Sequence, residues 1–164
     1  MHITCLILAC GNTLREDDGV GPFLAQWAEE RWRGDDRVRV LCDHQWTPEM
    51  VEEVAQAESV VFVDCATNCE AGLVRTMAVE PVGADSKMGT HHLDAGQLLA
   101  LSSQFYGVMP RSSLLLTVGA GSLELREGFS DAVREALPEA SRILEESVQR
   151  LLDVPGCPEA NQRA

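Results

Sequence analysis

Short apolar segments alternate along the chain with longer segments in which hydrophobic positions recur at helical spacing. The first apolar segment, residues 3–8, contains one polar residue, as expected of a strand buried on both faces of a sheet. Similar strand-like segments follow at residues 38–42, 59–63, 73–79 and 114–118. Helical spacing predicts helices at residues 19–34, 47–57, 94–107 and 130–151. Strands that alternate with helices predict a three-layer α/β domain with a mainly parallel sheet.

Capping and turn residues set the expected ends of the helices. Thr47 precedes a proline and predicts one N-cap, while Asp94 and Ser130 predict two others. Pro138 falls inside the last helical segment and predicts a kink or a break there. Residues 81–90 carry turn residues without an apolar period, so they predict a loop.

The chain has the length of one domain. Its 164 residues are enough to bury a substantial core, and no internal repeat divides them. We therefore expect a single domain over residues 1–153. Residues 154–164 are rich in proline and polar side chains and predict a flexible C-terminal tail.

Charge and cysteine content narrow the range of partners. The formal net charge of −13 argues against nucleic acid or an anionic membrane, because both bind basic surfaces. The sequence has no apolar run long enough to span a bilayer and no signal-peptide pattern. None of the six cysteines forms a CxxC pair, so we expect free thiols, no disulfide and a cytoplasmic location. Cys5 should be buried within the sheet.

The segment between the first strand and the first helix, residues 8–21, carries the candidate chemistry. In open α/β sheets, ligands bind at such loops, at the carboxyl ends of the strands. Three consecutive acids, Glu16, Asp17 and Asp18, precede the helix. They either complement the positive end of the helix dipole or supply oxygen ligands to a divalent metal ion. Spacing alone leaves both interpretations open.

Two further polar residues also lie next to the end of a predicted strand or the start of a predicted helix. Asp64 follows the apolar segment at residues 59–63, and His91 precedes a helix together with His92. If the first and third strands are parallel neighbours, Asp18 and Asp64 converge, and a histidine from the loop closes the site. Two carboxylates and an imidazole suit a first-row divalent ion and leave positions for substrate or water. Taken singly, Asp64 can instead cap a turn or a helix, and His91 can be an exposed loop residue.

These motifs resemble those of the hydrogenase maturation endopeptidases. In that family a strand leads into Gly-Asn and then into Asp-Asp-Gly-x-Gly, as residues 10–21 do here. A second apolar strand ends in Asp-Ala, as at residues 61–66, except that cysteine replaces the alanine. A histidine flanked by serine or threonine precedes a helix, as at His91. A weaker match covers residues 121–130, so the resemblance extends over roughly residues 3–150.

The resemblance implies a twisted five-stranded sheet with helices on both faces, and it assigns roles to site residues. Asp18, Asp64 and His91 would contact a metal ion and take part in catalysis. Asp17 would support them or handle protons. Because His91 and His92 are adjacent, either one can be aligned with the histidine of the family. His91 is preferred because it directly follows the matching Thr90.

The resemblance also implies a function. These enzymes remove the C-terminal extension of the large subunit of a [NiFe]-hydrogenase once nickel has been inserted. The metal would be the nickel of that precursor, the precursor would be the partner, and no organic cofactor is implied. Gly11 and Asn12 are expected to bind this substrate. Because the sequence has neither a Gly-x-Ser-x-Gly elbow nor an HExxH helix, the expected nucleophile is water.

Two other functions are compatible with parts of the pattern. A nickel-checking chaperone would bind the precursor through the same ligands without cutting it. A dinucleotide-binding oxidoreductase is disfavoured, because the turn after the strand has one glycine, Gly11, where the G-x-G-x-x-G pattern needs three, and the acids of the loop would repel a pyrophosphate.

Overall fold

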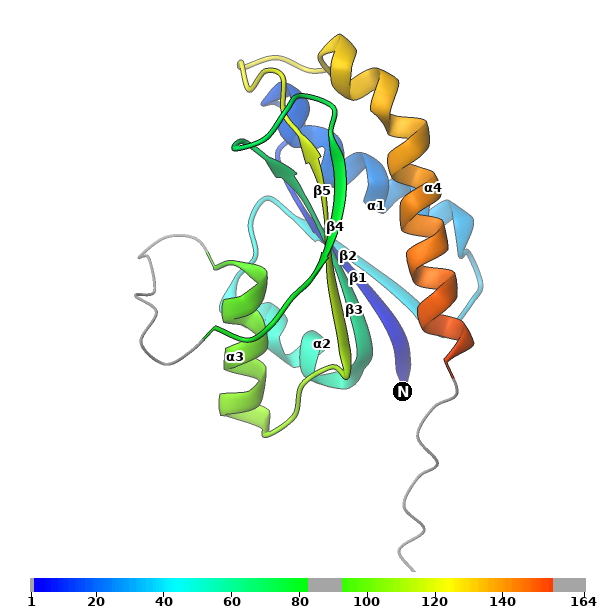
Figure 1. Ribbon diagram of the computed structural model, residues 1–164. Coiled ribbons are helices and arrows are strands. Elements are labelled where there is room, and N and C mark those ends of the chain that lie inside the picture. The colour runs from blue at the N-terminus through cyan, green and yellow to red at the C-terminus, as the bar shows by residue number, and fades with distance from the viewer. Residues whose placement is uncertain (1, 83–92, 155–164) are drawn as a thin grey trace, which may run out of the picture.

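A computed structural model describes residues 2–82 and 93–154 and has a five-stranded sheet with helices on both faces, as expected (Figure 1). The strands are β1 (Ile3–Cys10), β2 (Val38–Asp43), β3 (Ala57–Ala66), β4 (Val74–Ala78) and β5 (Ser112–Gly119). The helices are α1 (Val20–Arg31), α2 (Val51–Gln56), α3 (Ala95–Tyr106) and α4 (Asp131–Asp153). Short 3₁₀ turns cover Glu16–Gly19 and Pro48–Met50.

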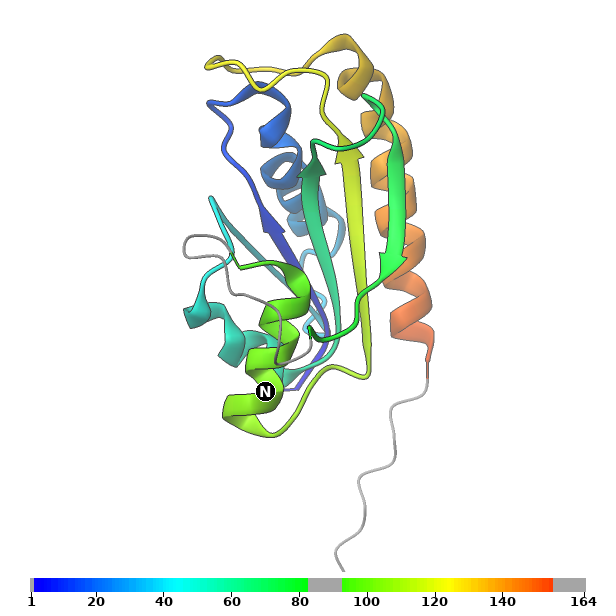
Figure 2. The same ribbon diagram turned by 60° about the vertical axis from the view of Figure 1, so that its left-hand side comes forward.

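The sheet is mainly parallel, in the order β2-β1-β3-β5-β4. β1 pairs in parallel with β2 on one side and with β3 on the other, and β3 pairs in parallel with β5. β4 lies at one edge and runs antiparallel to β5 (Figure 2). The carboxyl ends of β1, β2, β3 and β5 therefore share one end of the sheet. The neighbour relation between β1 and β3, on which the predicted site depends, is confirmed.

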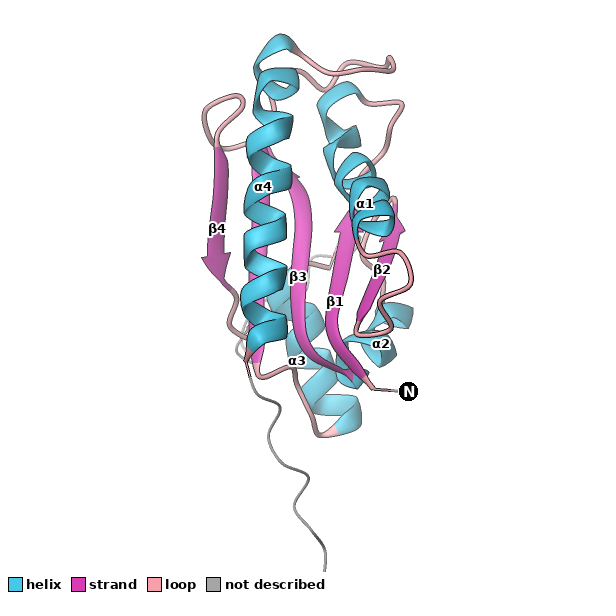
Figure 3. Ribbon diagram, turned by 90° about the vertical axis from the view of Figure 1, so that its right-hand side faces the viewer, coloured by secondary structure: helices cyan, strands magenta, loops and turns pink. Residues whose placement is uncertain are grey.

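The two faces of the sheet bury separate hydrophobic clusters. α1 and α4 cover one face, and α2 and α3 cover the other (Figure 3). Along β1, Cys5, Ile7 and Ala9 belong to the cluster beneath α1 and α4, whereas Leu6 and Leu8 belong to the opposite cluster. All of these side chains are fully buried, which confirms that β1 is covered on both faces and that Cys5 lies within the sheet.

The predicted caps of α3 and α4 are confirmed. Asp94 accepts a hydrogen bond from the Gln97 N–H, and the Gln97 side chain accepts one from the Asp94 N–H, so the two form a capping box. The Ser130 hydroxyl oxygen accepts a hydrogen bond from the Val133 N–H at the start of α4. Gly107 ends α3 with a positive φ of 69°.

Two local expectations are met only in part. Thr47 takes the N-cap position with Pro48 after it, but it caps a 3₁₀ turn that precedes α2, and its side chain makes no capping hydrogen bond. The break expected at Pro138 is absent. α4 runs without a break through Pro138 over 23 residues. Pro138 removes one backbone donor, but side chains on both sides of it pack on the sheet and hold the helix together. No helix within the described residues is long and apolar enough to cross a membrane. The predicted tail lies outside the described residues, apart from Val154.

Two glycines allow the loop after β1 to fold back tightly. Gly11 has a positive φ of 152°, and a Cβ atom there would lie 2.0 Å from the carbonyl oxygen of Asp18. A Cβ atom at Gly21, in the first turn of α1, would lie 2.0 Å from the carbonyl oxygen of Cys10. Glycine is therefore required at both positions, and α1 starts directly against the last residue of β1.

We expect Gly21→Ala to destabilise the protein, although alanine normally favours a helix over glycine by about 1 kcal/mol. The added methyl group has to displace the backbone of β1 or α1, and overpacking of this kind costs about 1–3 kcal/mol. Urea unfolding measures the effect. Gln26→Ala, at an exposed position of the same helix, is the control and should change stability by less than about 0.5 kcal/mol. Unchanged or increased stability of Gly21→Ala would contradict the close approach of α1 to β1.

Candidate functional site

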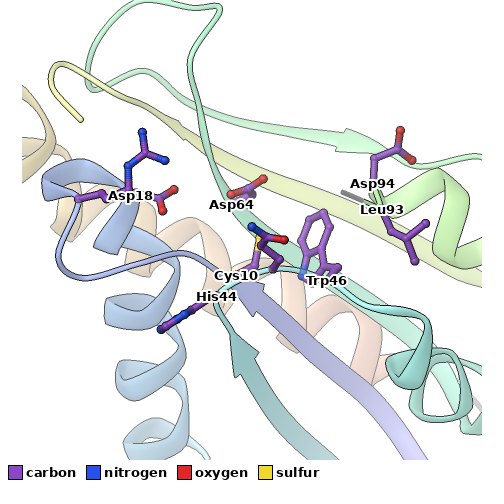
Figure 4. Close-up of a pocket in the computed structure, with 9 residues that line it drawn as sticks. Cys10, Asp18, His44, Trp46, Asp64, Leu93 and Asp94 are labelled. Atoms are coloured by element: carbon purple, nitrogen blue, oxygen red, sulfur yellow. The ribbon is translucent and has the colours of Figure 1, made fainter. Parts of the chain in front are cut away.

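A cleft of about 330 Å³ lies at the carboxyl ends of the central strands (Figure 4). Its walls come from the β1–α1 loop, the segment after β2, the end of β3 and the start of α3. The lining residues are Cys10, Arg15, Asp18, His44, Gln45, Trp46, Asp64, Leu93 and Asp94. The cleft brings together Asp18 and Asp64, the two carboxylates that the sequence assigns to neighbouring strand ends.

Asp18 is held by the loop that precedes it. Its Oδ2 accepts a hydrogen bond from the Asn12 N–H at 2.8 Å, and Asn12 Oδ1 accepts one from the Leu14 N–H at 2.9 Å. Oδ1 of Asp18 accepts no hydrogen bond from the described residues, so it is left for a ligand. Gly11 and Asn12 therefore shape the loop and orient Asp18. Neither belongs to the described lining of the cleft, and their contact with substrate stays a prediction.

Asp64 lies inside β3, where its backbone is in register with Thr117 and the strand continues to Ala66. The expectation that it ends the strand is therefore wrong, as is its interpretation as a turn or helix cap. Oδ1 accepts a hydrogen bond from the Cys65 N–H at 2.7 Å. Burial raises the pKa of Asp64, hydrogen bonds from the Cys65 N–H and the Cys10 thiol oppose this rise, and the charge of Asp18 adds to it. A cation in the cleft would relieve the repulsion between the two carboxylates.

The sequence predicts a histidine ligand, and among the described residues one histidine lines the cleft. His91 lies outside the described residues, so its role as a third ligand stays a prediction, although Leu93 and Asp94 just after it line the cleft. His44 lines the cleft from the segment after β2. Within residues 2–82 and 93–154, no three His, Cys, Asp or Glu side chains are arranged to hold a metal ion. This part of the chain supplies two carboxylates rather than a complete ligand set.

The segment after β2 is the part of the site that the sequence patterns did not single out. It contributes His44, Gln45 and Trp46 to the cleft. Because β2 is a parallel neighbour of β1, the residues that follow it reach the same end of the sheet as the loop that carries Asp18. The reasoning that placed Asp18 and Asp64 at the carboxyl ends of the first and third strands, applied also to the second strand, would have located these three residues.

Two thiols, Cys10 and Cys65, lie close to the carboxylates. Burial raises the pKa of both thiols, to about 12 for Cys65, and the negative charges of Asp18 and Asp64 add to the rise. Both therefore stay protonated at neutral pH. The described cysteines are all free, which agrees with the expectation of reduced thiols for this part of the chain.

Asp17 is completely buried and binds the connection between β5 and α4, residues 120–130. Its Oδ2 accepts hydrogen bonds from the N–H groups of Gly121 (2.7 Å) and Ser122 (2.9 Å) and from the Ser130 hydroxyl (2.7 Å). Its Oδ1 accepts one from the Ser130 N–H at 2.7 Å. Burial by itself raises the pKa of Asp17, but these hydrogen bonds outweigh it and lower the pKa below its ordinary value. These contacts tie the loop after β1 to the β5–α4 connection, and the role of Asp17 in the site, as a support or in proton handling, stays a prediction.

Glu16 makes a second link to the same connection. Its side chain is buried, and Oε1 accepts hydrogen bonds from Arg126 Nε (2.8 Å) and Nη2 (2.5 Å). Its backbone N–H donates to the Arg126 carbonyl oxygen at 2.9 Å. All three acids of the loop lie in the 3₁₀ turn, and the first turn of α1 contains none. The helix-dipole interpretation therefore does not describe Glu16 or Asp17, whose charges are held by donors from another part of the chain.

We expect Asp17→Asn to lower the free energy of unfolding by about 2 kcal/mol. The amide N–H₂ group would face at least one of the N–H donors that now bond to the carboxylate. Urea denaturation at pH 7 measures the change. The control is Asp131→Asn, at a side chain that is 93% exposed, and it should cost less than about 0.5 kcal/mol.

The effect of Asp17→Asn should also depend on pH. The folded state lowers the pKa of Asp17, so the carboxylate stabilises the fold above its unfolded-state pKa of about 3.9. This stabilisation is lost as the pH falls through the lower, folded-state pKa. The stability difference between the wild type and Asp17→Asn should be constant near neutrality and shrink below about pH 4. A difference that persists undiminished in acid would contradict a charge-dependent role for Asp17.

Two known proteins share sequence with this chain. The hydrogenase expression/formation protein HoxM of Azotobacter vinelandii is 31% identical over 143 residues, which cover 84% of this chain and 69% of HoxM. The hydrogenase expression/formation protein HupM of Azotobacter chroococcum mcd 1 is 32% identical over 134 residues, which cover 79% of this chain and 62% of HupM. No model of a protein family matches the chain.

Among solved structures, the hydrogenase maturating endopeptidase HybD from E. coli has the same fold. Its TM-score is 0.75 at 20% identity, over 92% of this chain and 93% of HybD. That similarity concerns the fold alone, whereas the identity to HoxM extends over most of both sequences. The chain therefore belongs to the family of hydrogenase expression/formation proteins that includes HoxM and HupM.

Proposed function

We propose that this protein is an endopeptidase that removes the C-terminal extension of a [NiFe]-hydrogenase large-subunit precursor after nickel insertion. Membership of the family supports a role in hydrogenase maturation. The structural relative HybD is itself called a hydrogenase maturating endopeptidase. The observation that carries the proposal is the pair of carboxylates, Asp18 and Asp64, in one cleft at the carboxyl end of the sheet.

The nickel ion in this proposal belongs to the precursor and arrives with it. Asp18 offers Oδ1, which accepts no hydrogen bond within the described part of the chain, and Asp64 offers a second carboxylate beside it. His91 is the proposed third ligand, because imidazole and carboxylate together suit first-row divalent ions. Two neighbouring negative charges favour a cationic group in the cleft over a neutral or anionic one. A precursor without nickel lacks that group.

Binding of the nickel would fix the scissile peptide relative to the cleft. Such orientation accelerates a reaction because the reacting groups no longer have to find each other. In the hydrolysis, water adds to the scissile carbonyl carbon and the C–N bond breaks. The amine of the released extension takes up a proton, and the mature subunit keeps the carboxyl group. Asp17 would act as a positioning residue, because its hydrogen bonds fix the loop that carries Asp18.

Incubation with nickel-loaded and nickel-free precursor tests the proposal, with the mass of the large subunit as the readout. We expect the loaded precursor to lose the mass of its extension and the nickel-free precursor to stay intact. A protein that binds the loaded precursor but leaves its mass unchanged would be a nickel-checking chaperone instead. Cleavage of both forms would refute recognition through nickel.

We expect Asp18→Asn to fold normally, since an amide oxygen can still accept the hydrogen bond from the Asn12 N–H. Cleavage of the nickel-loaded precursor should nevertheless slow by roughly 100-fold or more, because even outer-shell partners of a metal are worth about 10–100-fold. His91→Ala should have a similar effect on cleavage. Timed mass spectra of the large subunit measure the rates.

The matched control is again Asp131→Asn, which removes an exposed acid from the start of α4 and should cut at the wild-type rate. If Asp18 only complemented the helix dipole, its neutralisation would cost about 0.3–1 kcal/mol of stability and leave cleavage unchanged. A wild-type rate in Asp18→Asn would therefore rule out a role for this carboxylate in gripping nickel.

A further inference from the structure

Arg15 is a cationic residue in the wall of the cleft that the proposed function leaves unused. It lines the cleft together with Asp18 and Asp64, and it is exposed to solvent. Within residues 2–82 and 93–154, its guanidinium group forms no hydrogen bond and no ion pair. Other arginines of this acid-rich chain do pair with acids, as Arg126 does with Glu16. The cleft therefore contains a positive charge that the described part of the fold does not use.

The turn after β1 places Arg15 and Asp18 on the same side. The Asp18 N–H donates to the Arg15 carbonyl oxygen at 3.1 Å, so the two residues lie at the two ends of one 3₁₀ turn. Side chains three positions apart in such a turn lie on one side of it. The Arg15 N–H donates to the Asn12 carbonyl oxygen at 3.0 Å, and the backbone of Arg15 also forms a bridge with Arg126. The backbone of Arg15 is thus fixed at the cleft, and its guanidinium group is left for a ligand.

The backbone donors around the cleft are already used. The Asn12 N–H donates to one of the two facing carboxylates, and the Cys65 N–H donates to the other. The His44 N–H is bonded to the side chain of the preceding aspartate, and the Asp94 N–H to a glutamine side chain. A negatively charged oxygen in the cleft therefore needs a side chain as its donor. Among the described lining residues, Arg15 is the one with a permanent positive charge, and guanidinium offers five N–H groups.

Hydrolysis of a peptide bond creates such an oxygen. When water adds to the scissile carbonyl carbon, the π electrons move onto the carbonyl oxygen, which becomes negative. The C=O bond forms again as the C–N bond breaks, and the released amine takes up the proton that the water loses. We propose that Arg15 donates hydrogen bonds to this oxygen and stabilises its negative charge in the transition state. The assignment rests on the proposed function, which supplies the peptide.

The nickel ion of the precursor makes this role electrostatically consistent. Asp18 and Asp64 attract the guanidinium group as long as their charges are not compensated. A divalent ion held by both carboxylates cancels their two negative charges, and the charge of Arg15 is then available to the oxygen. The carboxylates are thereby matched to the metal ion of the substrate, and Arg15 is matched to the charge that the reaction creates.

The test replaces Arg15 by alanine and measures cleavage of the nickel-loaded precursor at several precursor concentrations. The negative charge exists only in the transition state, so kcat should fall by roughly 100- to 1,000-fold while KM changes by less than about threefold. The Kd of the variant for the loaded precursor should stay within about threefold of the wild-type value for the same reason. The Tm should change by less than about 2 °C, because the side chain has no partner in the described part of the fold.

Two further measurements separate a charge at the reacting oxygen from a structural effect. Arg15→Lys retains the positive charge and should recover part of the lost kcat. Added guanidinium ion, at concentrations well below those that unfold the protein, should restore part of the activity of Arg15→Ala. The matched control is Arg142→Ala on α4, where the arginine pairs with Glu146 at the surface. It should cut at the wild-type rate, with or without guanidinium.

Three results would overturn the assignment to Arg15 while the proposed function stands. One is a wild-type rate in Arg15→Ala, as expected of an arginine that is merely solvated. Another is a raised KM with unchanged kcat, which would show that Arg15 binds an anionic group of the precursor in the ground state. The third is a lowered Tm without rescue by guanidinium, which would show a structural role. If the wild-type protein does not cut the loaded precursor, the proposed function fails together with this assignment.

Discussion

The buried carboxylate of Asp17 is the contact on which the functional end of the molecule depends. It holds a negative charge in a fully buried position and is satisfied by donors from the connection between β5 and α4. A buried charge without such partners costs several kcal/mol, so the loop after β1 and this connection must stay together in the folded state. Asp18, the next residue, is placed as a consequence. The site and the fold are therefore stabilised by the same hydrogen bonds.

The three consecutive acids of the loop have different roles although they are chemically alike. Glu16 and Asp17 are buried and accept hydrogen bonds from residues 121–130, whereas Asp18 accepts one backbone hydrogen bond and lines the cleft. The difference arises from the 3₁₀ turn, in which successive side chains point in different directions. One short turn thus supplies two anchoring carboxylates and one that is free for a ligand.

The sequence predicts most of the fold because its signals are local. The strands follow from apolar segments, and the caps at Asp94 and Ser130 bond to backbone groups only three residues away. The role of Asp17 could not be predicted in this way, since its partners lie more than 100 positions later in the chain. Trp46 was missed for a related reason. Its place in the cleft follows from the pairing of β2 with β1, and not from any motif in its own segment.

The electrostatics of the cleft explain how the site can favour one kind of substrate. Asp18 and Asp64 line the same cleft, and the charge of Asp18 adds to the raised pKa of Asp64. Under the proposed function, the nickel ion of the precursor would relieve the repulsion between the two carboxylates. A precursor without nickel would leave that repulsion in place. The fold holds both carboxylates before any ligand binds, and preorganisation of this kind gives a site its selectivity.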